Sequence, residues 1–220
     1  MIGYYNYTVI LTYIGTLFGF TGIMYTWNGN VRAALICLML AGFCDMFDGK
    51  VASLRERTKQ EKRFGIQIDS LSDLICFGVL PALIIINYSG SFALNSVPAI
   101  ICKILGALYI LCALIRLAWF NVDEEERQSQ ETGSRENYLG LPVTTAALIF
   151  PIAIGIGGLV NSYLVKFPLE KVSPYFLLVV AAAFLTPFHL KKPKLVGKLI
   201  MIAVGVVGCA TVIFGIGEGI

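Results

Sequence analysis

The chain has 220 residues, of which 57% are hydrophobic and 14% are charged, with a net charge of +3. Soluble domains usually carry about 25% charged residues, and here the apolar residues gather in long runs, so the composition favours transmembrane helices over a soluble domain. The small net charge gives no reason to expect a nucleic-acid partner. The six cysteines form no CxxC pair, so we expect free buried thiols rather than disulfides or zinc ligands.

Seven apolar segments, taken in chain order, predict about seven spans, with six to eight as the range. Their approximate bounds are 5–27, 31–54, 66–88, 98–120, 141–162, 173–190 and 196–218. Short connections leave little chain for a soluble domain, so residues 1–220 are predicted to form one all-α, polytopic transmembrane helical bundle. The acidic run at 123–127 is interpreted as a solvated loop.

Lysine and arginine are distributed unequally between the predicted connections. The connections after the second, fourth and sixth spans hold ten of them, from Arg55 to Lys194, and the opposite connections hold three, namely Arg32, Lys166 and Lys171. Because positive loops stay in the cytoplasm, this asymmetry predicts that the first group and the N-terminus are cytoplasmic.

Four aspartates lie inside predicted spans. Asp45 and Asp48 are three residues apart in the second span, and Asp69 and Asp73 are four apart in the third, so each pair shares a helix face. An aspartate at the bilayer centre costs about 2.5–3.5 kcal/mol, which makes such residues functional candidates. Because the two helices run antiparallel across a short loop, all four side chains are expected near the cytoplasmic boundary.

A cluster of carboxylates in one pocket needs protons or cations. Oxygen ligands suit Mg²⁺ or Mn²⁺, and four carboxylates suit a pair of ions that clamps a transferring phosphoryl group. The small residues Gly49, Ala52 and Gly65 are expected to open a groove for a nucleotide beside these ions. An ion-coupled membrane transporter is the alternative from another class, because it would also need intramembrane carboxylates.

The residues 45–52 read D-x-x-D-G-x-x-A, and the residues 65–73 read G-x-x-x-D-x-x-x-D. This pattern resembles the signature of the CDP-alcohol phosphatidyltransferase family. The stretches 63–82, 116–121 and 140–142 are similar to its CDP-diacylglycerol–serine O-phosphatidyltransferase branch. The chain departs from the pattern at Ser53, where the family usually has arginine, and in a longer spacer before Gly65. Arg55 or Lys50 is a candidate to replace that arginine.

The resemblance implies an enzyme that transfers a phosphatidyl group from CDP-diacylglycerol to L-serine, giving phosphatidylserine and CMP. Glycerol phosphate and inositol are the alternative acceptors. It further implies a multi-pass protein of the cell membrane, surrounded by membrane lipids, with a cytoplasmic active site and a homodimeric assembly.

The resemblance also assigns roles to the site residues. Asp45, Asp48 and Asp69 would hold Mg²⁺ or Mn²⁺ ions that bind the CDP pyrophosphate, and Asp45 would contact CDP together with Gly49, Ala52 and Gly65. Asp73 would complete the second metal site or take the proton from the attacking hydroxyl.

The carboxylate of serine needs a cation that takes no part in the chemistry. Arg116, an arginine near the cytoplasmic end of the fourth predicted span, is the first candidate. Its alternative role is an interfacial anchor, and Arg63 and Arg135 are alternative cations in loops. Ser72 and Asn121 are candidate polar contacts for the acceptor.

Overall fold

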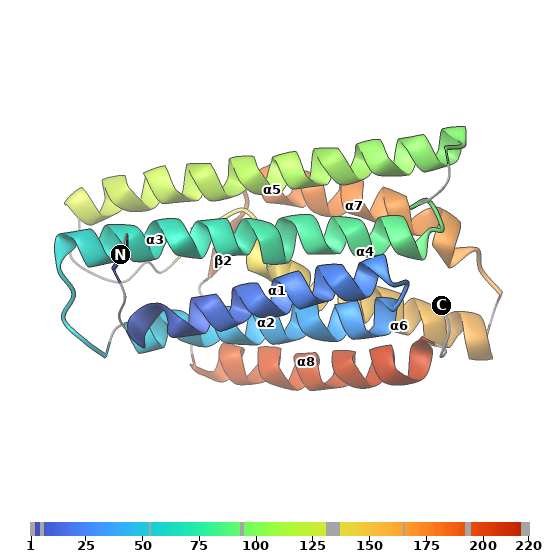
Figure 1. The fold of residues 1–220 in the computed structure, drawn as a ribbon, viewed down its shortest axis with the longest axis horizontal. Helices are drawn as coiled ribbons and strands as arrows, with labels where there is room; N and C mark the ends of the chain where they lie inside the picture. Colours follow the sequence, from blue (N-terminus) through green and yellow to red (C-terminus); the bar gives the residue numbers. More distant parts are fainter. Residues whose placement is uncertain are drawn as a thin grey trace.

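The computed structural model is an all-α bundle of long helices that lie roughly side by side (Figure 1). It describes residues 3–4, 7–52, 54–92, 95–130, 137–164, 166–191 and 195–216. The elements are η1 (Tyr7–Val9), α1 (Ile10–Trp27), α2 (Val31–Ala52), α3 (Lys59–Asp73), η2 (Leu74–Val79), α4 (Leu80–Tyr88), α5 (Val97–Gln130), β1 (Asn137–Leu139), η3 (Val143–Thr145), α6 (Ala146–Tyr163), α7 (Leu169–Leu185), β2 (His189–Lys191) and α8 (Leu195–Gly215). The predicted all-α class is confirmed.

Three pairs of neighbouring helices build the bundle, namely α1 with α2, α5 with α7, and α6 with α8. Figure 1 shows α1 along α2, and α8 along the outer side of the bundle. Large buried side chains from several helices form the core, among them Leu38, Phe77, Tyr109, Phe150 and Phe184. The core therefore runs along the length of the bundle.

The elements α3, η2 and α4 form one continuous helix from Lys59 to Tyr88. It begins earlier than the predicted span because Thr58 caps it: its hydroxyl accepts from the Glu61 N–H, and the Glu61 carboxylate accepts from the Thr58 N–H. Lys59–Tyr88, Val97–Arg127 and Val143–Tyr163 are long and apolar enough to cross a membrane. The number of spans stays a prediction.

Two segments differ from their predicted structure. The acidic run 123–127 continues α5 as helix, so the loop prediction was wrong there. Glutamate and arginine are good helix formers, and Arg127 pairs with Glu124 one turn earlier, at 2.6 Å between Nη2 and Oε1. The helix α7 ends at Leu185 rather than near residue 190, because Thr186 is extended before Pro187.

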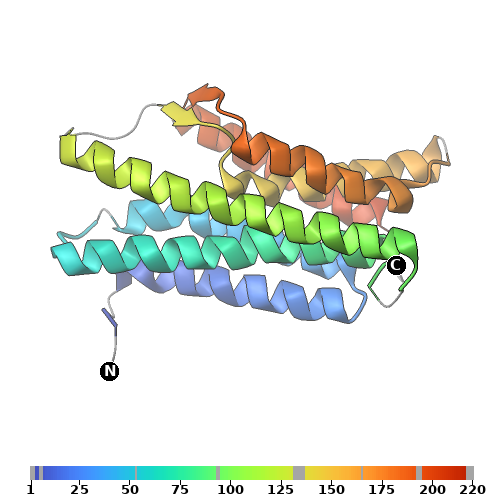
Figure 2. The same ribbon diagram turned by 90° about the horizontal axis from the view of Figure 1, so that it is seen from above.

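After Pro187, the strand β2 pairs antiparallel with β1, with Leu190 opposite Tyr138 (Figure 2). This pair joins the segment before α6 to the segment after α7. It also places Gly140, with φ of 81°, beside the end of α7, where its N–H donates to the Phe188 carbonyl at 2.6 Å. Leu141, the next residue, is positioned by the same turn and becomes a partner of the candidate site residue Arg116.

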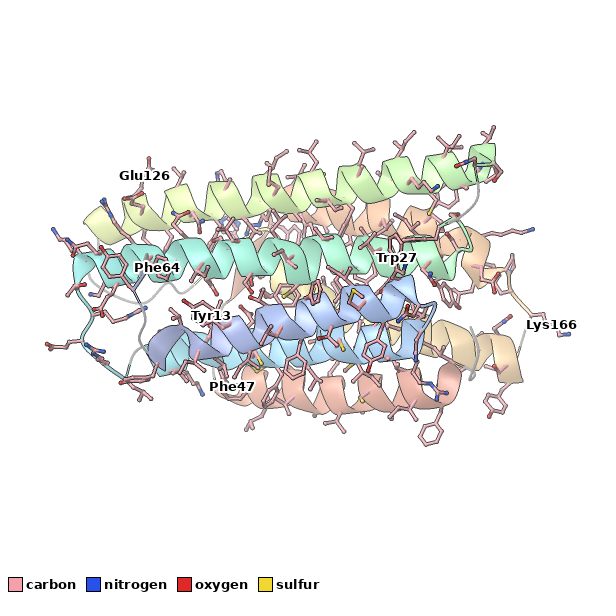
Figure 3. The ribbon with its side chains drawn as sticks, in the orientation of Figure 1. Tyr13, Trp27, Phe47, Phe64, Glu126 and Lys166 are labelled. Atoms are coloured by element: carbon pink, nitrogen blue, oxygen red, sulfur yellow. The ribbon has the colours of Figure 1, made fainter. Side chains whose placement is uncertain are left out.

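The two ends of the bundle carry different connections. Figure 3 shows Phe64 of α3 and Glu126 of α5 at one end, and Lys166 at the other. The basic connection 54–58 lies at the same end as Phe64. The arrangement fits the predicted grouping of positive loops, while the side of the membrane stays a prediction. Arg135, Lys192 and Lys194 lie outside the described residues.

Candidate active site

Three carboxylates meet where α2 and α3 face each other. Asp45, Asp48 and Asp69 each offer one oxygen, and these oxygens all lie within 4.8 Å of one another. Asp45 and Asp48 are adjacent because three residues nearly complete a helical turn, and Asp69 reaches them from α3, which follows α2 in the chain. The Thr12 hydroxyl of α1 donates to Asp48 Oδ2 at 3.3 Å. The helix α1 thus supplies an uncharged hydrogen-bond donor to the cluster.

The cluster has the donor set and nearly the spacing that a hard divalent cation requires. Oxygen ligands lie 2.0–2.1 Å from Mg²⁺, so two oxygens on one ion are about 3–4 Å apart. Oxygens within 4.8 Å of one another need to contract only slightly around an ion. No lysine or arginine is among the residues that line the cavity of these three half-buried carboxylates. Their negative charge is therefore left for a bound cation to neutralise. The described residues therefore fit Mg²⁺ or Mn²⁺.

The carboxylates open into a small cavity of about 10 Å³, which is room for about one water molecule or ion. Asp73 is buried, with 9% exposure, and lies in the same cavity outside the tight group of three. All four predicted aspartates thus share one cavity. Its lining residues are Leu11, Thr12, Gly15, Ala41, Asp45, Asp48, Asp69, Ser72, Asp73, Cys76 and Phe77.

The predicted nucleotide-binding positions lie toward the open end of α2 and α3. A Cβ atom at Gly49 would meet nothing within 4 Å, so the space beside it is open. Ala52 borders a second cavity of about 490 Å³. A Cβ atom at Gly65 would lie 3.2 Å from Nη1 of Arg57, so the missing side chain leaves room for that guanidinium group. Ser53 lies outside the described residues.

The second cavity is basic. Besides Ala52 and Glu56 it is lined by Arg55, Arg57 and Lys62. Ala52 is four residues beyond Asp48 on α2, which places the second cavity about 6 Å along the helix axis from the acidic one. The other candidate replacement for the family arginine, Lys50, lies instead over the Phe47 ring, 5.6 Å from its centroid.

Of the three predicted acceptor contacts, Ser72 lines the acidic cavity, whereas Asn121 and Arg116 lie at two other places. Ser72 lines the acidic cavity, and its hydroxyl lies 2.7 Å from that of Thr16. Asn121 of α5 donates to the Ser70 hydroxyl at 2.8 Å, on α3 next to Asp69. Neither Asn121 nor Arg116 lines the acidic cavity. The structure thus brings Ser72 to the carboxylates and ties Asn121 to their helix.

Arg116 is buried, with 5% exposure. Its Nε donates to the Leu141 carbonyl at 3.1 Å, and its guanidinium carbon lies 4.9 Å from the Trp119 ring centroid. An interfacial anchor would reach toward solvent, whereas this side chain is held within the protein. This contact places the stretch 116–121 beside the stretch 140–142.

Sequence reasoning missed the contribution of the first helix. Thr12 and Thr16 contact Asp48 and Ser72, yet single threonines in an apolar span are unremarkable. The signal was a stripe of small buried residues on one face of α1, where side chains from α2 and η2 approach closely. That stripe comprises Thr12, Gly15, Gly19, Gly22 and Thr26.

Comparison with known proteins adds a family match. The model of the CDP-alcohol phosphatidyltransferase family matches residues 5–207. Archaetidylserine synthase of Methanothermobacter thermautotrophicus is 34% identical over 139 residues, covering 63% of this chain and 53% of that protein. CDP-diacylglycerol–serine O-phosphatidyltransferase of Saccharomyces cerevisiae is 35% identical over 153 residues, covering 64% and 52%.

The protein of the same name from Helicobacter pylori is 30% identical over 150 residues, covering 68% of this chain and 57% of that protein. The chain therefore spans about half the length of the curated relatives it matches. All three names mention serine, and the archaeal protein is named for archaetidylserine whereas the other two are named for CDP-diacylglycerol and serine.

Proposed function

The chain belongs to the CDP-alcohol phosphatidyltransferase family, and on that premise we propose that it transfers the phosphatidyl group of CDP-diacylglycerol to L-serine and releases CMP. The observation that carries the proposal is the acidic cavity between α1, α2, α3 and η2, which is lined by four aspartates and Ser72. Serine is the favoured acceptor because the names of these three relatives all include serine.

The proposed reaction is a displacement at phosphorus. The hydroxyl oxygen of serine bonds to the lipid-side phosphorus, the bond from that phosphorus to the bridging oxygen breaks, and CMP leaves with the electron pair. Bound divalent cations would neutralise the charge that develops on the phosphate oxygens. Asp45, Asp48 and Asp69 are proposed to hold these cations, and their places on α2 and α3 set the spacing of the ligands.

Asp73 is proposed to take the proton from the serine hydroxyl. It lies in the cavity but outside the group of three whose oxygens are within 4.8 Å of one another. That position suits a base that faces the acceptor. It suits less well a fourth ligand of the ion that the other three aspartates would hold. Ser72, one residue before it, is proposed to orient the acceptor from the cavity wall.

The basic cavity is proposed to receive the nucleotide phosphates. Arg57 and Lys62 border it, and Arg55 does so while lying 4.0 Å from Glu61. Arginine suits phosphate because its fork donates two parallel hydrogen bonds. We infer that the loop beyond α2 supplies the cation that the family pattern has at position 53, and that Gly49 leaves space for the nucleotide beside it.

Arg116, whose Nε donates to the Leu141 carbonyl, is proposed to bind the carboxylate of serine through its guanidinium group. We further propose an integral membrane protein whose acidic cavity faces the cytoplasm, since the basic loop 54–58 lies at the same end of α2 and α3. A homodimer stays part of the proposal on the strength of the family alone.

An acceptor panel tests the function. Purified protein in vesicles with CDP-diacylglycerol and Mn²⁺ should release CMP with serine, and far less with glycerol phosphate or inositol. Release only with another acceptor would refute serine and leave the phosphatidyl transfer standing. A protein that releases no CMP with any acceptor but moves cations across the vesicle membrane would be a transporter.

A further inference from the structure

The helix from Lys59 to Tyr88 contains a π-turn directly after Asp73. In this turn, η2, the Leu80 N–H donates to the Ile75 carbonyl five residues earlier, instead of four as in an α-helix. Single π-turns inside α-helices occur frequently at functional sites. Two residues of the turn, Cys76 and Phe77, line the acidic cavity. The irregular backbone is therefore part of the wall of the proposed active site.

A proline follows this turn and removes a donor from it. Pro81 has no N–H, so the Phe77 carbonyl, four residues earlier, receives no hydrogen bond from position 81. The Tyr109 hydroxyl of α5 donates to that carbonyl at 2.7 Å. Tyr109 and Phe77 are both buried, with 0% and 1% exposure, so bulk water does not reach the bond.

The ring of Tyr109 is held in place by other aromatic side chains. Its centroid lies 5.6 Å from that of Phe150, edge to face, and 5.5 Å from that of Phe184. These contacts fix the ring while the hydroxyl points at η2, and they remain if only the hydroxyl is removed. The hydroxyl and the ring can therefore be tested separately.

We propose that Tyr109 is a positioning residue, whose hydroxyl replaces the amide missing at Pro81 and fixes the π-turn that holds Asp73 and Phe77 at the cavity. A buried carbonyl without a donor is costly, so losing the hydroxyl drives the turn to rearrange. Asp73 and Phe77 then shift relative to Asp45 and Asp48, which are held on α2. The inference rests on the proposed function for its kinetic part and on the structure alone for its backbone part.

The first experiment follows the backbone and needs no activity. Tyr109→Phe should accelerate amide hydrogen exchange in the segment 74–80, measured by mass spectrometry on the protein in detergent. Tyr88→Phe is the matched control, because Tyr88 is also a buried tyrosine, on α4, and it should leave exchange in this segment unchanged. Unchanged exchange in Tyr109→Phe overturns the inference, whatever the enzyme does.

The second experiment follows turnover. Misplacing reacting groups by about 1 Å can cost about 100-fold in rate, so Tyr109→Phe should lower kcat by about 10- to 100-fold. The KM for CDP-diacylglycerol should change little, because α2 and the basic loop hold that substrate. If KM rises and kcat does not, Tyr109 does not position the reacting groups and the inference fails.

A double substitution identifies the bond responsible. Pro81→Ala supplies an N–H that, in the α-helical pattern, donates to the Phe77 carbonyl. In the Pro81→Ala background, Tyr109→Phe should therefore accelerate amide exchange less, and lower kcat less, than it does in the protein that keeps Pro81. Equal losses in both backgrounds overturn the inference. If the wild-type protein releases no CMP, the proposed function fails, and the exchange measurements still decide whether the hydroxyl fixes the turn.

Discussion

The carboxylate cluster predicts an unusual stability effect for Asp69→Asn. The carboxylate oxygens lie within 4.8 Å of one another. Without a bound cation, two ionised carboxylates at this limiting separation repel by about 3.5 kcal/mol at an effective dielectric constant of about 20, before protons or counterions relieve the repulsion. Asparagine at 69 removes two such pairs and keeps nearly the same shape. The substitution should therefore stabilise the metal-free protein. Relief of only about 1 kcal/mol raises Tm by about 2–4 °C for a chain of this size.

The same substitution should weaken the response to metal. At a Mn²⁺ concentration about 100 times its Kd, binding stabilises the wild-type protein by about 2.7 kcal/mol. A tenfold weaker site at the same concentration gives about 1.4 kcal/mol, so the Mn²⁺-induced rise in Tm should be roughly halved. Tm is measured in detergent with chelator, and again with excess Mn²⁺.

Glu125→Gln is the matched control for Asp69→Asn. Glu125 is a carboxylate at the same end of the bundle, 75% exposed, and paired with the equally exposed Arg63 at 3.3 Å. Exposed pairs contribute little, so this variant should change neither Tm nor the Mn²⁺ response. The reasoning is refuted if Asp69→Asn lowers the metal-free Tm and leaves the Mn²⁺ shift at its wild-type size.

The other predictions concern substrate contacts and orientation. Arg116→Lys should raise the KM for serine by about 10- to 100-fold, because lysine lacks the bidentate fork, while the KM for CDP-diacylglycerol stays nearly constant; parallel rises in both would mean that Arg116 supports the fold or the nucleotide. Arg57→Ala should raise the KM for CDP-diacylglycerol by about tenfold, whereas Arg63→Ala, which removes an exposed cation outside the basic cavity, should not; equal effects would show only a general loss of positive charge. A cysteine at Gln60 should react with an impermeant reagent only from the cytoplasmic side of the membrane, and one at Lys166 only from the outside; the opposite labelling would invert the proposed orientation.

The aspartates were predictable because their signal is local. Spacings of three and four residues place side chains on one helix face whatever the tertiary structure, and a short loop makes two helices neighbours. The prediction that Asp45, Asp48, Asp69 and Asp73 converge needed only these two facts. Helix existence followed equally well from apolar runs, as the agreement between predicted 31–54 and observed Val31–Ala52 shows.

Features that depend on distant partners were not predictable. The pairing of β1 with β2 involves three residues on each side, about fifty positions apart, and neither segment alone favours a strand. The π-turn is another case, because a proline within a helix indicates no more than a kink and the donor to the Phe77 carbonyl comes from Tyr109 on another helix. Thr12 was missed for the same reason, since its role is defined by Asp48 across the helix pair.

Helix ends near charged residues were the least accurate part of the prediction. Hydropathy places the end of a span where charge begins, whereas a helix ends where its backbone pattern breaks. The helix α5 therefore continues ten residues beyond its predicted end at 120, to Gln130, through a charged stretch. The helix α3 starts at Lys59 because Thr58 caps it, seven residues before the predicted start at 66.

The central claim is that the acidic cavity is where a lipid phosphoryl group passes from CMP to serine. The most direct test follows labelled serine into lipid while CMP is measured in the same vesicles, with purified wild-type protein and Asp69→Asn. We expect one CMP for each serine incorporated, loss of both with chelator, recovery with Mg²⁺ or Mn²⁺, and at most a small residual rate in Asp69→Asn. Wild-type rates of serine incorporation in Asp69→Asn, or in excess chelator, would contradict the claim.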